Sequence, residues 1–201
     1  MTARYQSTTL GWLSATTLSW CLSCFLAPAA LAADDLDRVM SALAERKHGE
    51  VTFVERKYLA VLDRPVESSG ELLYDAPDRL EKRTLKPKPE TLVLEHGVVT
   101  AERGRHRYQL DLQRYPQVLP FIESIRATLA GDRAALERVF HVNFSGDFQH
   151  WTLDLEPGAS QLAGLVKHIR IQGEQAMVRT VEIQEADGDR SEMIIGDEAH
   201  P

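Results

Sequence analysis

After a long apolar run at the N-terminus, the first clear pattern along the chain is that of a helix. Between residues 34 and 48, apolar residues recur at i, i+3, i+4 and i+7, along one face of an α-helix. These residues are Leu36, Val39, Met40 and Leu43. Asp34 or Asp35 can cap the start of this helix, and Gly49 can adopt the left-handed conformation that ends it.

Most of the chain that follows alternates between apolar and polar residues in short runs bounded by turn residues, which predicts antiparallel strands. We predict strands over residues 51–62, 66–74, 79–85, 90–95, 98–102, 106–112, 139–144, 149–155, 166–172, 177–184 and 190–195. The dipeptide Asp187-Gly188 between the last two is the strongest hairpin signal in the chain.

The pattern becomes helical again in the middle of the chain, over residues 118–130, and a second short helix is predicted from Asp132 to Leu136. The longer helix places Leu119, Ile122, Ile125 and Leu129 on one stripe, with Phe121 beside it and Gly131 able to end it. The fold class is therefore α+β, with roughly ten antiparallel strands in one sheet and helices before and within the series of strands.

A sheet of this size curls, and its concave face must be covered. We expect an unclosed half-barrel whose few helices cover the concave face and enclose an apolar space, which is a usual arrangement for binding a lipid. The candidate cavity and lid residues are the apolar positions of the predicted helices and strands. They are Leu36, Val39, Met40, Leu43, Phe53, Leu72, Tyr74, Leu92, Leu94, Tyr108, Leu110, Leu119, Phe121, Ile122 and Ile125.

The N-terminal segment is typical of a cleavable signal peptide. Arg4 is its one charged residue, an apolar run follows, and Ala30-Leu31-Ala32 places small residues where signal peptidase requires them, so we expect cleavage before Ala33. Two alternatives stay open, a transmembrane anchor and a lipoprotein signal acylated at Cys24. Under the first interpretation, residues 1–32 are removed, residues 33–201 form a single domain, and the mature protein is periplasmic.

Composition narrows the function further. The predicted mature chain has 169 residues with 22 basic and 30 acidic side chains, a net charge of −8, which argues against nucleic-acid binding. Both cysteines, Cys21 and Cys24, lie in the leader, so the mature chain has no disulfide, no Cys-ligated metal and no Cys nucleophile.

We find no enzyme signature and no basis for a cofactor or a metal site. There is no G-x-S-x-G, H-E-x-x-H, P-loop or G-x-G-x-x-G motif, and the seven histidines show no metal-binding spacing. Two groups of basic residues fit solvated strand edges and turns, with contacts to anionic headgroups or an acidic partner as the alternative. They are Lys82, Arg83, Lys86 and Lys88, and Arg103, Arg105 and Arg107.

Several segments, in order along the predicted mature chain, resemble the LolA family of outer-membrane lipoprotein carriers, and more closely its divergent LolA-like branch. The helix at residues 36–43 leads into Val51-Thr-Phe-Val-Glu-Arg56, and Ser69-Gly70-Glu71-Leu72-Leu73-Tyr74-Asp75-Ala76-Pro77 is similar to the second strand of the family. Residues 79–82, 89–92 and 95–97 follow at the spacing of the family, and residues 182–191 resemble the final hairpin.

The resemblance implies a periplasmic carrier, without catalysis, that shields lipid chains in a concave sheet beneath a lid of helices and ferries its cargo toward the outer membrane. The chain departs from the family pattern at Ala76, where the carriers have Arg, and at Glu81 and Arg83, where they have aromatic residues. The implied partners are an acylated or other apolar cargo, an inner-membrane exporter and an outer-membrane acceptor. We expect a monomer without stable membrane insertion. The alternative function is a regulatory module that senses lipid or lipoprotein.

Overall fold

The computed structural model describes residues 28–115, 119–158 and 160–198 of the 201-residue chain. Helix α1 spans Pro28–Glu45, so Asp34 and Asp35 lie within it and do not cap its start. Gly49 does not end the helix in a left-handed conformation, because β1 already begins at His48 and Gly49 pairs with Tyr74. The Ala76 N–H donates to the Lys47 carbonyl at 2.8 Å, so the pairing with the segment that ends at Asp75 begins directly after the helix.

Eleven strands follow the predicted alternation closely. The first group is β1 (His48–Tyr58), β2 (Val66–Asp75), β3 (Arg79–Lys86), β4 (Glu90–Glu95), β5 (Val98–Arg103) and β6 (His106–Asp111). The second group is β7 (Phe140–Gly146), β8 (Trp151–Pro157), β9 (Val166–Glu174), β10 (Met177–Glu185) and β11 (Arg190–Glu198). Each predicted strand range overlaps one of these elements.

All eleven strands form one antiparallel sheet in the order β6-β5-β4-β3-β2-β1-β11-β10-β9-β8-β7. The first and last strands therefore pair in the middle, while β6 and β7 lie at opposite edges. The segment that connects these edges has to cross a face of the sheet. It contains the 3₁₀ helix η1 (Leu112–Arg114), α2 (Leu119–Leu129) and α3 (Arg133–Glu137).

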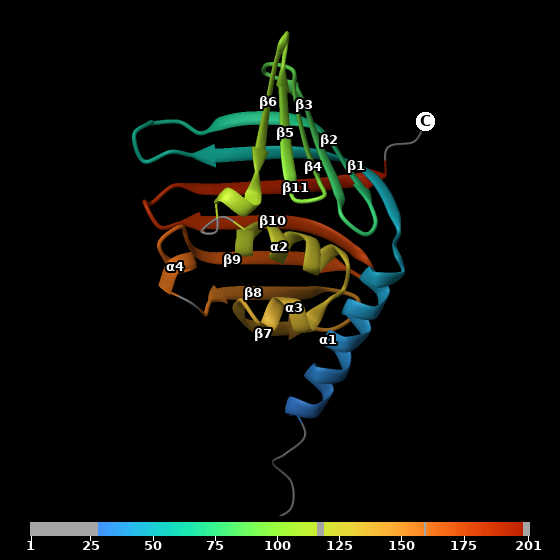
Figure 1. Ribbon diagram of the computed structural model, residues 1–201. Coiled ribbons are helices and arrows are strands. Elements are labelled where there is room, and N and C mark those ends of the chain that lie inside the picture. The colour runs from blue at the N-terminus through green and yellow to red at the C-terminus, as the bar shows by residue number, and fades with distance from the viewer. Residues whose placement is uncertain (1–27, 116–118, 159, 199–201) are drawn as a thin grey trace, which may run out of the picture.

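The sheet curls strongly, and the connecting helices lie across it (Figure 1). In this view α2 lies over β9 and β10, α3 lies over β7 and β8, and the strands from β3 to β6 run steeply relative to β7–β11. Gly131 ends α2 as predicted, with a φ of 64°. The four-residue helix α4 (Ser160–Ala163) between β8 and β9 was not predicted, because it is too short to show a period.

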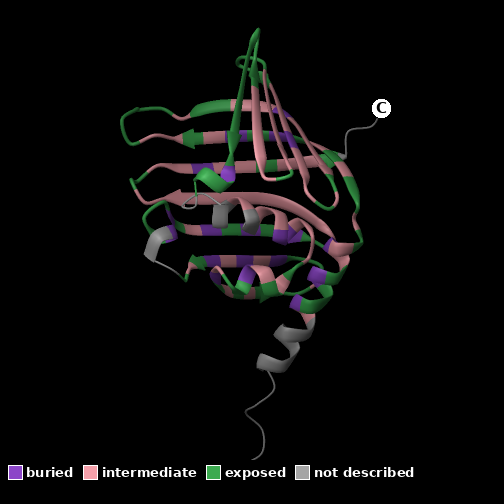
Figure 2. Ribbon diagram, in the orientation of Figure 1, coloured by how far each residue is buried: buried purple, intermediate pink, exposed green. Residues whose placement is uncertain are grey.

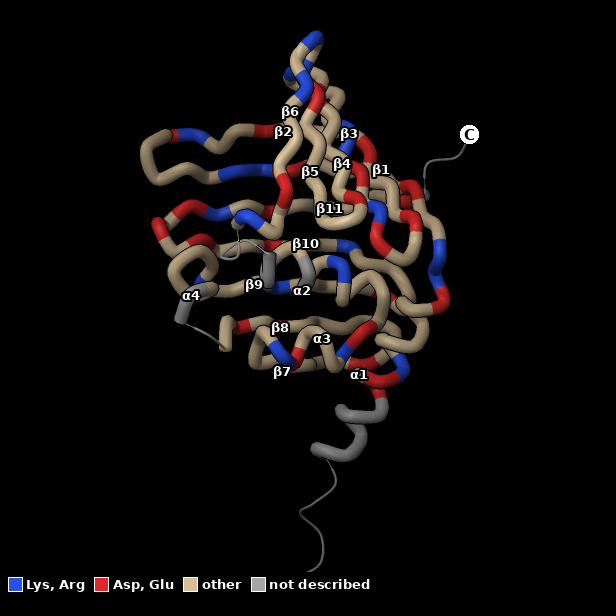
Figure 3. The backbone as a smooth tube through the Cα atoms, in the orientation of Figure 1, with Lys and Arg blue, Asp and Glu red and all other residues tan. Residues whose placement is uncertain are grey.

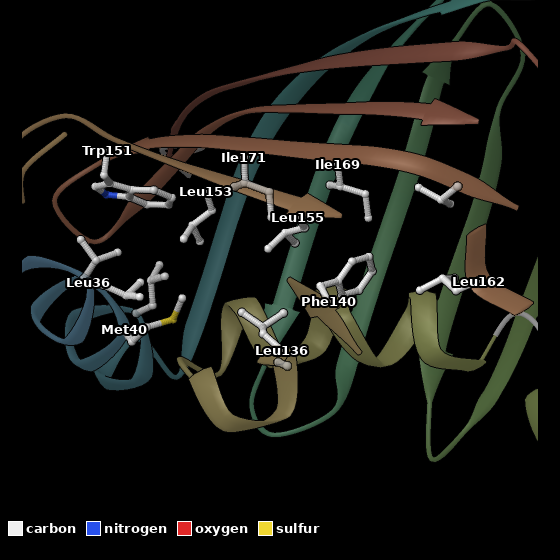
Figure 4. Packing of buried hydrophobic residues seen from close by; sticks show 14 residues of the cluster. Leu36, Met40, Leu136, Phe140, Trp151, Leu153, Leu155, Leu162, Ile169 and Ile171 are labelled. Atoms are coloured by element: carbon white, nitrogen blue, oxygen red, sulfur yellow. The ribbon is translucent and has the colours of Figure 1, made fainter. Parts of the chain in front are cut away.

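The hydrophobic core lies at one end of this arrangement (Figure 4). It joins α1, α3 and α4 to the inner residues of β7, β8 and β9. Its fully buried members are Val39, Leu136, Leu153, Leu155, Leu162 and Trp151. The Trp151 indole N–H donates to the Gln175 carbonyl at 2.9 Å, so the largest core side chain has its polar atom satisfied.

Candidate functional site: an apolar cavity beneath α2

A cavity of about 430 Å³ lies between the concave face of the sheet and α2. Its surface is almost entirely apolar, and its volume lies within the range of about 300–1,000 Å³ that is usual for small-molecule sites. Strands β1–β5 and β8–β11 contribute side chains to it, as do α2 and the end of α1. The cavity therefore extends across both wings of the sheet.

Helix α2 covers the cavity with one face. Ile122, Ile125 and Leu129 border the cavity at helical spacing, together with the buried Thr128. Across the cavity, burial raises the pKa of the Tyr74 hydroxyl, and the nearby positive charge of Arg126 partly offsets this rise. The neutral phenol is therefore favoured on this wall.

The register of the strands explains the floor of the cavity. Leu72 lies directly opposite Val51 on one side and Lys82 on the other, and Lys82 lies opposite Leu92, so these four residues form one row across β1–β4. Tyr74, Leu80, Leu94 and Val99 form the next row. Because residues two apart on a strand share a face, both rows lie on the concave side.

One ion pair interrupts this apolar floor. The Lys82 ammonium donates to the Glu55 carboxylate at 2.5 Å and lies 4.9 Å from the centre of the Phe53 ring. The Ser68 hydroxyl donates to the same carboxylate at 3.1 Å. The Glu55 side chain is only 9% exposed and that of Lys82 is 22% exposed, so this pair is largely removed from water.

Two of the three residues that depart from the family pattern, Glu81 and Arg83, lie on the other face of β3. Glu81 accepts hydrogen bonds from Arg79 and from Arg83, each at 2.6 Å. Glu95 and Glu71 extend this network on either side, at 3.2 Å from Arg79 and 3.7 Å from Arg83. The network gives ion-pair partners to both residues: Arg83 is paired on this face, and Glu81, only 7% exposed, is paired although it also borders the cavity.

Seven of the fifteen residues singled out in the sequence border the cavity. They are Leu43, Leu72, Tyr74, Leu92, Leu94, Ile122 and Ile125. Leu36, Val39 and Met40 share the helix face of Leu43 and pack with it into the hydrophobic core, but they do not border the cavity. Phe53 is buried on the concave face beneath Lys82 and does not border the cavity.

The remaining four lie elsewhere. Tyr108 and Leu110 are 63% and 37% exposed on β6, because no further strand or helix covers this edge of the sheet in the described part of the chain. The side chains of Leu119 and Phe121 lie outside the described residues. The basic residues also separate, since Arg83 joins the convex network while Lys82 borders the cavity.

The half of the floor that lies on the C-terminal strands is absent from the candidate residues predicted from the sequence. These lining residues are Leu155, Ile169, Ile171, Val181, Ile183, Met193 and Ile195. The alternation in residues 166–172 and 177–184 was enough to predict strands with one apolar face. It did not indicate that this face meets β1–β5 across one cavity, because that contact depends on the pairing of β1 with β11.

Within the described residues, no helix is both long and apolar enough to cross a bilayer. The same part of the chain contains no cluster of His, Cys, Asp and Glu that could hold a metal ion. Its buried side-chain nitrogen and oxygen atoms all have hydrogen-bond partners.

Several solved structures resemble this fold at low sequence identity. A LolA superfamily protein from Nitrosomonas europaea matches with 8% identity and a TM-score of 0.43, covering 85% of this chain and 94% of that one. LprF from Mycobacterium bovis matches with 13% identity and a TM-score of 0.40, covering 85% and 93% of the two chains. A putative outer membrane lipoprotein-sorting protein domain from Vibrio parahaemolyticus matches with 11% identity and a TM-score of 0.42, covering 84% and 92%.

No curated protein matches the sequence. The family model described as outer membrane lipoprotein carrier protein LolA-like, in contrast, matches residues 27–200, nearly the whole chain. The open antiparallel sheet and its crossing helices agree with the α+β half-barrel predicted from the sequence. The chain therefore belongs to the LolA-like family of outer membrane lipoprotein carrier proteins.

Proposed function

We propose that this protein is a periplasmic carrier that holds the apolar chains of a lipoprotein or another lipid-like cargo in the cavity beneath α2. The observation that carries the proposal is the cavity itself, about 430 Å³ in volume and lined by apolar side chains from nine strands and two helices. Membership of the LolA-like family supports a binding role over catalysis.

The physical need for such a carrier follows from the cost of exposing hydrocarbon to water. Each CH₂ group exposed costs about 0.8 kcal/mol, so an acyl chain does not leave a membrane at a useful rate without an enclosed apolar site. The cavity lies between elements that are far apart in the sequence, with α2 on one side and the sheet on the other. Movement of α2 alone would widen the exit, so release would not require unfolding of the sheet.

The same proposal includes export. We assign residues 1–32 to a cleaved signal peptide and residues 33–201 to a single mature domain. The cargo would pass from an inner-membrane exporter to an outer-membrane acceptor, and the carrier would act as a monomer. N-terminal sequencing of protein recovered from the periplasm should give Ala33 as the first residue. An acylated Cys24 or an intact leader would contradict this part.

The central experiment is a titration of the delipidated mature protein with a fluorescent apolar probe. We expect saturable binding near one probe per protein. The Leu80→Trp variant should bind the probe much more weakly, because Leu80 borders the cavity and a larger side chain fills it. Leu85→Trp is the matched control, because Leu85 lies on the same strand but is 55% exposed.

The outcomes separate clearly. Saturable binding that Leu80→Trp reduces and Leu85→Trp does not would support the carrier. A folded, delipidated protein without saturable binding would reject it. Equal binding of the probe by both variants would show that the probe binds outside this cavity.

A further inference from the structure

The ion pair on the cavity floor lies beside apolar lining residues on both sides. Lys82 faces Leu72 on β2 and Leu92 on β4, and all three border the cavity. Glu55 lies directly opposite Met193 of β11, which also borders it. The pair is therefore part of the same concave surface that would contact a bound hydrocarbon chain.

The charges around this pair do not cancel. Lys57 lies on the same face of β1 as Glu55, with its ammonium 3.8 Å from the second oxygen of the Glu55 carboxylate. Two ammonium groups thus share one carboxylate, so the cluster has a net positive charge. Ser68 adds a hydroxyl beside it, which can donate to or accept from a polar ligand.

Folding stability does not explain this arrangement well. A buried ion pair is often neutral or unfavourable for stability compared with apolar side chains of the same shape, because both charges lose their water. The neighbours of Lys82 in its row are apolar, so Leu or Met at position 82 would extend the row formed by Val51, Leu72 and Leu92. A charge in this place is better explained by a polar group that enters the cavity with the cargo.

A second cation, Arg46, also borders the cavity, but its position has a structural explanation. It follows directly after Glu45, the last residue of α1, where a positive charge stabilises the carbonyl end of the helix. Its guanidinium also lies 2.6 Å from the Met177 sulfur. Lys82 lies in the middle of a strand and has no comparable role.

We propose that the cargo of this cavity is an amphiphile with one anionic end, and that Lys82 binds that end while the hydrocarbon chain lies along the apolar floor. This inference rests on the proposed carrier function and narrows its cargo to a carboxylate or a phosphate attached to an acyl or alkyl chain. Glu55 holds Lys82 on the floor when the site is empty. The incoming anion replaces Glu55 as the partner of the ammonium, and Lys57 remains beside the displaced carboxylate.

The test uses ligands with the same chain and different ends, measured by displacement of the apolar probe from the mature protein at monomeric ligand concentrations. We expect lauric acid and lauryl phosphate to bind about tenfold more tightly than lauryl alcohol, as a charge-assisted hydrogen bond would give. Laurylamine should bind more weakly than the alcohol. The ratio between the two acids identifies whether the carboxylate or the phosphate is the better fit.

Three variants test whether Lys82 causes the preference for an anionic end. Lys82→Met should make the acid and the alcohol bind equally well, while affinity for the alcohol stays within about twofold of the original. The double variant Lys82→Met with Glu55→Gln should behave in the same way, and it avoids leaving a buried carboxylate without its partner. Lys86→Met is the matched control, because Lys86 is exposed on the same strand, and it should keep the full preference.

The inference is wrong if the original protein does not distinguish acid from alcohol, or if the preference survives in the double variant. It is also wrong if Arg46→Met removes the preference and Lys82→Met does not. In each of these cases the alcohol still binds and the carrier function stands. If no ligand of the series displaces the probe, both proposals fail together.

Discussion

The two wings of the sheet, on either side of the central β1–β11 pair, differ in how deeply their side chains are buried. On the wing of β7–β9, side chains such as Phe140, Leu153 and Ile169 are almost completely buried against the helices. On the wing of β2–β6, the buried residues in the described part of the chain are Gly70 and Glu81, and the apolar side chains are half-buried or exposed. Figure 2 shows this contrast, with the buried positions gathered in the lower strands and in α1.

Charges follow the same division. Lys, Arg, Asp and Glu account for five of the eight residues of β3, whereas β7 carries none of them (Figure 3). A densely packed core supplies stability, and unfilled apolar space lowers it. The comparison therefore indicates that the β7–β9 wing stabilises the fold, while the other wing provides the open part of the binding surface at little cost to stability.

The largest expected effect of a substitution is on the densely packed wing, β7–β9, called the packed wing below. Leu153→Ala should lower the free energy of unfolding by about 3–5 kcal/mol, because Leu153 is fully buried and its removal leaves a cavity in dense surroundings. The fraction that remains folded should bind the apolar probe normally, since Leu153 does not border the cavity. Denaturant unfolding and probe titration measure the two effects. A change below about 1 kcal/mol would show that this wing is not densely packed.

A smaller effect is expected where α2 meets α1. Gly131→Ala should destabilise the protein by about 2–3 kcal/mol, because position 131 has a left-handed backbone and its new Cβ would lie 2.0 Å from the Met40 carbonyl oxygen. Gly104→Ala is the control, since Gly104 has a similar φ of 60° with no atom within 4 Å of the added carbon. It should cost about 1 kcal/mol. Equal losses in the two variants would mean that α2 and α1 separate easily.

On the open wing, β2–β6, a substitution should affect ligand binding more than stability, the opposite of the packed wing. Leu72→Ala should lower stability by only about 1 kcal/mol, because Leu72 is half-buried and already borders an open space. It should weaken probe binding several-fold, since it removes part of the floor. The same two measurements apply as for Leu153→Ala. If Leu72→Ala unfolds the protein as readily as Leu153→Ala, the two wings do not differ in their contribution to stability.

Most of the secondary structure could be predicted from the sequence because alternation and helical spacing are local properties. Depth of burial is not local. Leu36 and Leu43 lie on one stripe of α1 and both pack in the core, yet only Leu43 also borders the cavity. The periodicity shows which face of the helix is buried. How far along the helix the cavity begins depends on where β7 and β8 pack.

The same limit explains the edge of the sheet and the charged residues. Tyr108 and Leu110 lie on the predicted apolar face of β6, but nothing in the described residues covers that edge. Lys82 and Arg83 are adjacent in one basic group of the sequence, but neighbours on a strand point to opposite faces. The strand period of two therefore separates Lys82 from the side of Arg83.

The smallest expected effect lies in the turn between β7 and β8, at the rim of the packed wing. The backbone N–H groups of Gln149 and His150 donate to the Asp147 carboxylate at 2.8 and 3.0 Å, and these bonds lower the pKa of Asp147 below its ordinary value. A carboxylate with a lowered pKa in the folded state stabilises the protein above the pKa of the unfolded chain. That contribution disappears as the pH falls through the lower, folded value.

The Asp147→Asn variant isolates this contribution, because its amide oxygen can still accept both bonds but does not titrate. At neutral pH we expect its thermal midpoint to lie slightly below that of the original protein, since bonds to an ionised acceptor are stronger. The difference should shrink as the pH falls below about 4, where the Asp147 carboxylate takes up its proton. Thermal melts of both proteins across this pH range measure it. A difference that grows in acid would mean that the turn is stabilised by other groups, and that the rim of the packed wing does not depend on Asp147.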